Sequence, residues 1–281
     1  MTEGIALFHV PGLAKPARTW YKIIGDLHSK STPLVVLHGG PGACHDYLLP
    51  LTDLSVPLVF YDQIGNGKST HLPERNGDED FWSVELFKNE LNNLLKHLGL
   101  DSRPIDVYGR AACSQPNGHL ASMDTWRIGI TSLRKQLPED VQVVLDEAEK
   151  SQKFETPEYA AAIEVFYKRH LSLARPYPAP EVKAALDWFE ADGTTYGTMY
   201  GPSELSITGS LRNWTIIPEL HNIKVPTLLI NAVNDEAQDV TMQPFADNIK
   251  NSKWVKLDNA AHFSHVDQRK EYIQHIQDFL E

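Results

Sequence analysis

The sequence predicts an α/β fold with a mostly parallel sheet. Two short, continuous apolar runs, at 33–38 and 56–61, have the pattern of strands that are buried on both faces. A third run follows at 105–109, and between the second and third runs the leucines of 81–98 recur at helical spacing. Strand, helix and strand in this order are typical of a parallel sheet.

Glycines mark the ends of these elements, and the same alternation returns near the end of the chain. Gly39 and Gly40 stop the first run, and Gly99 stands where a helix stop is expected. After residue 220, the runs 225–231 and 254–257 are predicted strands, and 268–280 is a predicted amphipathic helix. We therefore expect the C-terminal part to rejoin the same α/β core.

The middle of the chain has a different pattern, typical of a helical insertion. Helix-forming residues dominate 138–153 and 157–173, and prolines follow at Pro176, Pro178 and Pro180. The sequence predicts a core formed by residues 1–120 and 206–281, with a helical cap formed by residues 121–205.

Composition excludes several classes of partner. The formal charge of -11 and the pI near 5.5 argue against binding to nucleic acid or to an anionic membrane, which need clustered Lys and Arg. Two cysteines and no apparent signal peptide or membrane-spanning run favour a reducing, cytoplasmic location. The loop histidines His38, His45 and His71 lack metal-site spacing, so we expect neither metal nor organic cofactor. The sequence leaves the oligomeric state open.

A glycine-rich turn and two polar residues after predicted strands are candidates for a catalytic site. In His38-Gly-Gly-Pro-Gly42, the N–H groups of Gly39 and Gly40 suit an oxyanion hole, although an ordinary turn is the alternative. Asp235 and His262 each follow a strand, in the order expected for the acid and the base of a catalytic triad. The alternatives are that Asp235 caps a helix and that His262, one of 12 histidines, is an ordinary loop residue.

The combination of motifs resembles the proline iminopeptidase family of α/β-hydrolases. The motifs are His38-Gly-Gly-Pro-Gly42, Tyr61-Asp-Gln-Ile-Gly-Asn-Gly-Lys-Ser69, Gly201-Pro-Ser-Glu204, Asn234-Asp-Glu236 and Ala261-His262. The resemblance implies a serine hydrolase that releases an N-terminal residue, often proline, from small peptides or amides. It makes Asp235 and His262 the triad acid and base, and it makes Glu204 and Glu236 the carboxylates that hold the free amino group of the substrate. Opposite charges in a partly dry pocket favour such an ion pair.

The chain departs from the family where the nucleophile is expected. Family members follow the third strand with a Gly-x-Ser-x-Gly-Gly turn, whereas this chain has Ala111 in place of the serine. Ser114 is the best substitute nucleophile and Cys113 the second. Residues 110–120 are also too few for a helix and a further strand, which together take about 15 residues or more. We therefore expect one central strand and the nucleophile helix to be missing.

Three interpretations of this departure remain. The chain is a hydrolase with a relocated nucleophile, or a non-catalytic relative that binds a small amine or peptide, or a truncated version of an active enzyme. A hydrolase of small esters or amides in specialised metabolism is a further alternative. Because Ala111 cannot attack a carbonyl, we expect peptide hydrolysis by this chain to be strongly impaired.

Overall fold

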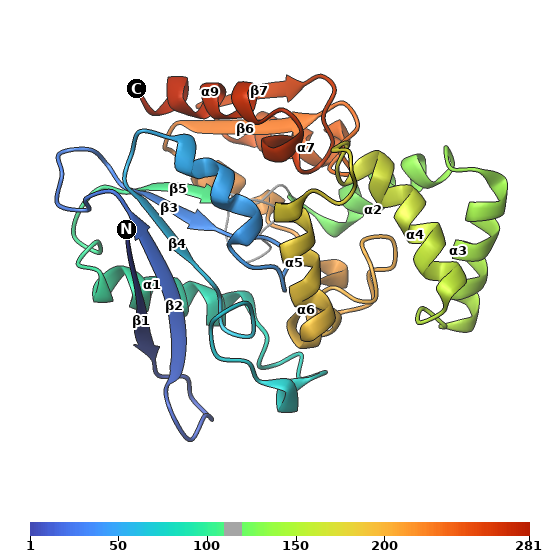
Figure 1. The fold of residues 1–281 in the computed structure, drawn as a ribbon, viewed down its shortest axis with the longest axis horizontal. Coiled ribbons are helices and arrows are strands. Elements are labelled where there is room, and N and C mark those ends of the chain that lie inside the picture. The colour runs from blue at the N-terminus through green and yellow to red at the C-terminus, as the bar shows by residue number, and fades with distance from the viewer. Residues whose placement is uncertain (110–119) are drawn as a thin grey trace. The chain divides into compact units, whose positions relative to one another are not determined.

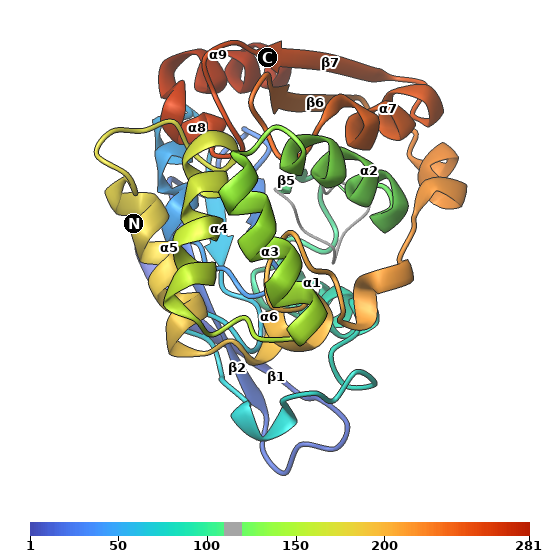
Figure 2. The same cartoon turned by 90° about the vertical axis from the view of Figure 1, so that its right-hand side faces the viewer.

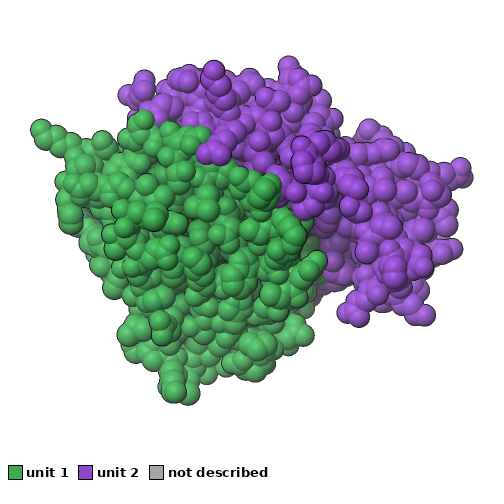
Figure 3. All heavy atoms as spheres, viewed as in Figure 1, with its two compact units in different colours: residues 1–119, 180–201 green, residues 120–179, 202–281 purple. Residues whose placement is uncertain are grey.

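The chain folds into two compact units (Figure 3). The computed structural model describes residues 1–109 and 120–281 of the 281-residue chain. The first unit comprises residues 1–119 and 180–201, and the second comprises residues 120–179 and 202–281. These units divide the chain differently from the predicted core and cap, and that core-and-cap division remains a prediction.

The first unit is built on a five-stranded sheet (Figure 1). Its strands are β1 (Thr2–Phe8), β2 (Ala17–Ile24), β3 (Leu34–Leu37), β4 (Leu58–Tyr61) and β5 (Asp106–Gly109). Their order is β1-β2-β4-β3-β5, with antiparallel pairing of β1 with β2 and of β2 with β4, and parallel pairing of the rest. Every residue of β3 and β4 is buried, as their continuous apolar runs predict.

Helix α1 (Val84–His97) covers the core of this sheet. It begins where the Ser83 hydroxyl accepts a hydrogen bond from the Leu86 N–H, and Gly99 follows its end with a φ of +67°. Leu91 and Leu94 pack into the same apolar cluster as the sheet residues Val35, Leu37 and Val59. The predicted helix over 81–98 is thus confirmed, with slightly narrower bounds.

The remaining helices of the first unit are short or come from the middle of the chain. They are η1 (Asp46–Asp53), η2 (Pro73–Arg75), α5 (Pro180–Ala191) and α6 (Thr194–Met199), where η denotes a 3-10 helix. Helix α5 packs against η1, which follows the glycine-rich turn directly. Residues of the predicted cap therefore cover this turn.

The second unit contains a two-stranded parallel sheet and the C-terminal helices. Its elements here are η3 (Ser210–Asn213), η4 (Ile217–Asn222), β6 (Thr227–Ala232), α7 (Asp239–Asn248), β7 (Ser252–Leu257), α8 (Ser264–Asp267) and α9 (Arg269–Leu280). Helix α7 connects β6 to β7, and its residues Met242 and Phe245 belong to the same buried apolar cluster as Leu229 of β6. This arrangement confirms the strands and the closing helix predicted for the C-terminal part.

Three longer helices complete the second unit. They are α2 (Met123–Arg134), α3 (Glu139–Ser151) and α4 (Pro157–His170). Helices α3 and α4 run side by side (Figure 2). Helix α4 starts with Pro157 after Thr156, whose hydroxyl accepts a hydrogen bond from the Tyr159 N–H at 3.2 Å.

The sheet arrangement agrees with the predicted α/β class. Of the five strand pairings in the described residues, three are parallel. Strand β5 lies at the edge of the first sheet, and β6 belongs to the second sheet. Within residues 1–109 and 120–281, no strand pairs with both β5 and β6. In the same residues, no helix is long and apolar enough to cross a bilayer.

Candidate functional site

Asp235 lies in a turn after β6 and is fully buried. Its N–H donates to the Ala232 carbonyl at 3.2 Å, and its Oδ1 accepts a hydrogen bond from the Ala237 N–H at 2.7 Å. The neighbouring residue Asn234 donates through its N–H to the carbonyl of Ala260 at 3.1 Å, which joins this turn to the loop after β7. Parallel pairing of β6 with β7 puts both loops at the same edge of the sheet.

His262 lies in the loop after β7, and its Nδ1 is 2.8 Å from Asp235 Oδ1. A carboxylate oxygen can only accept, so Nδ1 carries the proton and donates it to Asp235. The Nε2 atom of the neutral ring is then the basic nitrogen. This buried pair has the geometry of a general base oriented by an acid.

Glu236 is the next residue after Asp235 and is also buried. Its Oε1 lies 3.9 Å from His262 Nε2, on the side of the ring opposite the contact with Asp235. The second unit therefore brings three predicted site residues, Asp235, Glu236 and His262, into one cluster. A carboxylate beside the basic nitrogen provides a place for a cationic group.

Glu204, the fourth predicted residue in this unit, is held by two aromatic side chains. The Tyr167 hydroxyl donates a hydrogen bond to Glu204 Oε2, and Trp126 Nε1 donates to the Glu204 carbonyl at 3.1 Å. Burial raises the pKa of Tyr167 well above its ordinary value, and the charges of Glu204 and Glu236 raise it further. Tyr167 therefore stays protonated and donates its hydroxyl hydrogen to Glu204.

Tyr177 adds a further polar group near the acidic residues. Burial raises its pKa, and so do the charges of Glu164, Glu236 and Glu204. Among the described residues, its buried hydroxyl has no hydrogen-bond partner. Sequence reasoning missed Tyr167 and Tyr177, because a tyrosine in a helical insertion normally packs in the core.

The predicted oxyanion glycines lie in the first unit, in the turn after β3. The Gly39 N–H donates to the Tyr47 hydroxyl at 2.7 Å, whereas the Gly40 N–H has no acceptor among the described residues. Gly40 has a φ of +116°, and a Cβ there would lie 2.5 Å from the Gly42 nitrogen. Only glycine fits this position. Of the two predicted donors, Gly40 is the one that the turn leaves available.

The loop that follows β4 supports this turn. Its Gln63 N–H donates to His38 Nε2 at 2.9 Å, and Asp62 accepts hydrogen bonds from the His45 N–H at 2.8 Å and from His45 Nδ1 at 2.9 Å. Burial alone would raise the pKa of Asp62, but the hydrogen bonds and charge of His45 hold it below the ordinary value. This second Asp–His pair joins the loop after β4 to the segment that leads into η1.

The nucleophile position and its substitutes cannot be placed in this geometry. Ala111, Cys113 and Ser114 lie outside the described residues. Among the described residues, no group of three or more His, Cys, Asp or Glu side chains is arranged to hold a metal ion. The expectations for the nucleophile and for cofactors therefore stay predictions.

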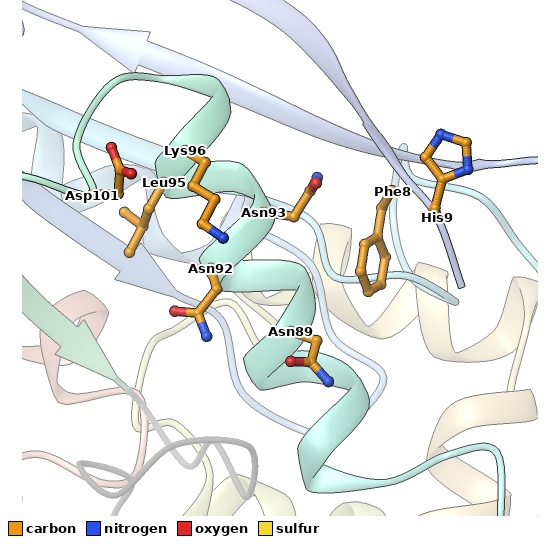
Figure 4. A pocket seen from close by; sticks show the side chains of 8 residues that line it. All are labelled: Phe8, His9, Asn89, Asn92, Asn93, Leu95, Lys96 and Asp101. Atoms are coloured by element: carbon orange, nitrogen blue, oxygen red, sulfur yellow. The ribbon is translucent and has the colours of Figure 1, made fainter. Parts of the chain in front are cut away.

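A surface groove of about 560 Å³ in the first unit is lined by other residues (Figure 4). It runs between the end of β1 and helix α1, where His9, Asn89, Asn93, Lys96 and Asp101 contribute polar groups. Asn93 is already engaged, because its Nδ2 donates to the Leu7 carbonyl at 2.9 Å. No predicted catalytic residue lines this groove.

Comparison with known sequences connects the chain to curated peptidases. No protein-family model matches it. It is 31% identical over 272 residues to a proline iminopeptidase of Heyndrickxia coagulans, which covers 91% of this chain and 92% of the relative. It is 30% identical over 267 residues to a proline iminopeptidase of Saccharolobus solfataricus, which covers 88% of this chain and 84% of the relative.

Comparison with solved structures agrees. The crystal structure of VinJ is 37% identical, with a TM-score of 0.88 and coverage of 99% of this chain and 98% of VinJ. The proline iminopeptidase of Mycobacterium smegmatis is 29% identical, with a TM-score of 0.86 and coverage of 99% and 97%. An α/β-hydrolase from a deep-sea metagenome is 17% identical, with a TM-score of 0.60, and supports the fold alone.

Proposed function

The chain belongs to the proline iminopeptidase family of α/β-hydrolases, and on that premise we propose that it binds the free amino group of a small peptide or amide at Glu204 and Glu236. The first amide bond of the ligand is then presented to His262. One observation carries this proposal, namely the 3.9 Å between His262 Nε2 and Glu236 Oε1. In an amino acid the amino nitrogen and the carbonyl carbon are only about 2.5 Å apart. An ammonium held by Glu236 therefore brings only the first carbonyl within reach of the base.

The charge of the cluster supports an amine ligand. Glu204 Oε2 accepts a hydrogen bond from the Tyr167 hydroxyl, as a carboxylate does, and the charges of Glu204 and Glu236 both raise the pKa of Tyr167. An N-terminal amino group is largely protonated at neutral pH, because its ordinary pKa is about 8. Two carboxylates facing one ammonium compensate the loss of hydration on both sides. Proline at the N-terminus, with its secondary amine, is the preferred ligand in this proposal.

The Asp235–His262 pair would supply the base for acyl transfer. In an intact relative, His262 would take the proton of a serine hydroxyl and Asp235 would stabilise the imidazolium that forms. In this chain Ala111 stands at the position of that serine, and an alanine side chain has no nucleophile. We therefore propose a protein that binds its ligand but hydrolyses it very slowly. A cytoplasmic location remains part of the proposal.

Ligand binding tests the first part of the proposal. Isothermal titration calorimetry would compare L-prolinamide with N-acetyl-L-prolinamide, which lacks the charged amine. We expect acetylation to weaken binding at least about tenfold, and Glu236→Gln and Glu204→Gln to weaken binding of L-prolinamide by about tenfold or more. Glu158→Gln is the matched control, because Glu158 is an exposed residue in the first turn of α4. Equal affinity for both ligands would overturn the amine-binding proposal.

Labelling tests the second part. The folded protein is treated with a fluorophosphonate probe, and intact mass and peptide mapping locate any adduct. We expect no stoichiometric adduct and negligible turnover of proline anilide. An adduct at Ser114 that disappears in His262→Ala would contradict the proposal and show a relocated nucleophile, and Cys113 is examined in the same map. Rapid turnover of simple esters with none of proline anilide would instead favour the small-ester hydrolase.

A further inference from the structure

The C-terminal end of helix α4 is hydrogen-bonded to both loops of the candidate site, the turn after β6 and the loop after β7. The His170 carbonyl, at the last residue of α4, accepts hydrogen bonds from the His262 N–H at 3.0 Å and from the Glu236 N–H at 3.3 Å. A single carbonyl oxygen therefore joins the base and its neighbouring carboxylate. Tyr167, one turn earlier, donates to Glu204.

The His170 side chain reinforces the same contact. Its Nδ1 lies 3.0 Å from the Asn234 carbonyl, and since a carbonyl only accepts, Nδ1 carries the proton. Burial lowers the pKa of His170, although the hydrogen bond to Asn234 and the charge of Asp235 oppose that effect. The ring is therefore neutral at pH 7 and holds the turn that contains Asp235 and Glu236.

The residues after α4 hold the other side of the His262 loop. The Leu171 carbonyl accepts a hydrogen bond from the Phe263 N–H at 2.7 Å. The Asp267 carboxylate accepts hydrogen bonds from the Ala261 N–H at 2.9 Å, the Ser172 hydroxyl at 2.6 Å and the Leu173 N–H at 3.0 Å. His262 is thus held at its own N–H and through both of its chain neighbours.

We propose that His170 and Asp267 are positioning residues that fix the base His262 and the amine-binding carboxylate Glu236 relative to each other from the end of α4. This inference rests on the proposed function for the roles of those two residues. Such support matters because a binding or catalytic group works only within about 0.5 Å of its productive position. Neither His170 nor Asp267 needs to touch the ligand.

The test uses a pair of substitutions at His170 and a spectroscopic readout of His262. His170→Phe keeps a ring but removes the N–H that donates to Asn234, whereas His170→Asn places an amide N–H close to the position of Nδ1. The pH midpoint of His262 is measured by NMR in the ligand-free protein, with its ring signals assigned from His262→Ala. The affinity for L-prolinamide is measured in parallel.

We expect His170→Phe to lower the His262 midpoint by about half a pH unit or more, because a loosened Asp235 stabilises the imidazolium less. It should also weaken L-prolinamide binding about tenfold, while His170→Asn restores both values to near wild type. An unchanged His262 midpoint in folded His170→Phe would overturn the inference. The midpoint is measured without ligand, so this result is independent of whether L-prolinamide binds, which concerns the proposed function alone.

Asp267→Asn gives a second route if His170→Phe does not fold. It removes the negative charge and leaves one amide oxygen for the donors on the two segments, so we expect it to shift the His262 midpoint as well. Asp278→Asn is the matched control, because Asp278 is an exposed residue of α9 that contacts only Gln274 among the described side chains, at 2.6 Å. If Asp267→Asn leaves the His262 midpoint unchanged, as the control Asp278→Asn does, the positioning role of Asp267 is contradicted.

Discussion

The buried carboxyl group of Glu90 makes the stability of the first unit depend on pH. Glu90 lies on α1 with no exposed surface, and its Oε1 accepts hydrogen bonds from the Thr19 hydroxyl at 2.6 Å and from the Ile64 N–H at 2.9 Å. Ile64 follows Gln63, which donates to His38 at the start of the glycine-rich turn. Glu90 therefore holds the loop that supports this turn.

Burial raises the pKa of Glu90 from 4.5 to about 8, and the charge of Asp62 adds to the rise while the hydrogen bonds oppose it. Between those two pH values the folded state keeps a proton that the unfolded state has lost. The free energy of unfolding therefore falls as the pH rises through this window, and it stops falling above about pH 8. The full rise corresponds to at most about 5 kcal/mol.

Glu90→Gln isolates this contribution because glutamine does not titrate. Its amide oxygen can take the place of Oε1 and accept from both Thr19 and Ile64. Relative to wild type, we expect the free energy of unfolding of the variant to rise by about 2 to 5 kcal/mol as the pH goes from 5 to 9. Urea unfolding at each pH measures this difference. Glu85→Gln on the same helix is the control, since exposed Glu85 pairs only with Lys88 among the described residues, at 2.9 Å, and should change by less than about 0.5 kcal/mol. A difference between wild type and Glu90→Gln that is the same at every pH would refute the reasoning.

Two further predictions concern the same unit. Gly40→Ala should lower the free energy of unfolding by about 3 kcal/mol or more, because its Cβ would meet the backbone at 2.5 Å. Gly77→Ala, at a φ of +77° with no atom within 4 Å, should cost only about 1 kcal/mol, and equal losses in urea unfolding would contradict the steric argument. Cys44 is fully buried, and burial raises the pKa of its thiol, as do the charges of Asp62 and Asp46. Iodoacetamide at pH 8 should therefore leave Cys44 unmodified in the native protein and alkylate it in denaturant, and modification of the native thiol in a peptide map would count against this environment.

Local patterns predicted most of the secondary structure but missed the first two strands. The runs at 33–38 and 56–61 became β3 and β4 because continuous apolar stretches bounded by glycine and loop residues have few other solutions. Strands β1 and β2 went unpredicted. The residues of β1 are half exposed, and its apolar residues give a weaker signal than those of a strand buried on both faces.

The sequence by itself determined the α/β class and the family, because these depend on residue type and on order along the chain; the roles of the acidic and basic residues stay predictions. It placed Asp235 and His262 each after a strand, but only the parallel pairing of β6 with β7 brought their side chains to 2.8 Å. Three hydrogen bonds were decided by the tertiary structure alone. They join Tyr167 to Glu204, Gly39 to Tyr47, and the His262 N–H to the His170 carbonyl. Their partners lie elsewhere in the chain, and a hydrogen bond depends on where two groups lie in space rather than on any local pattern of residues.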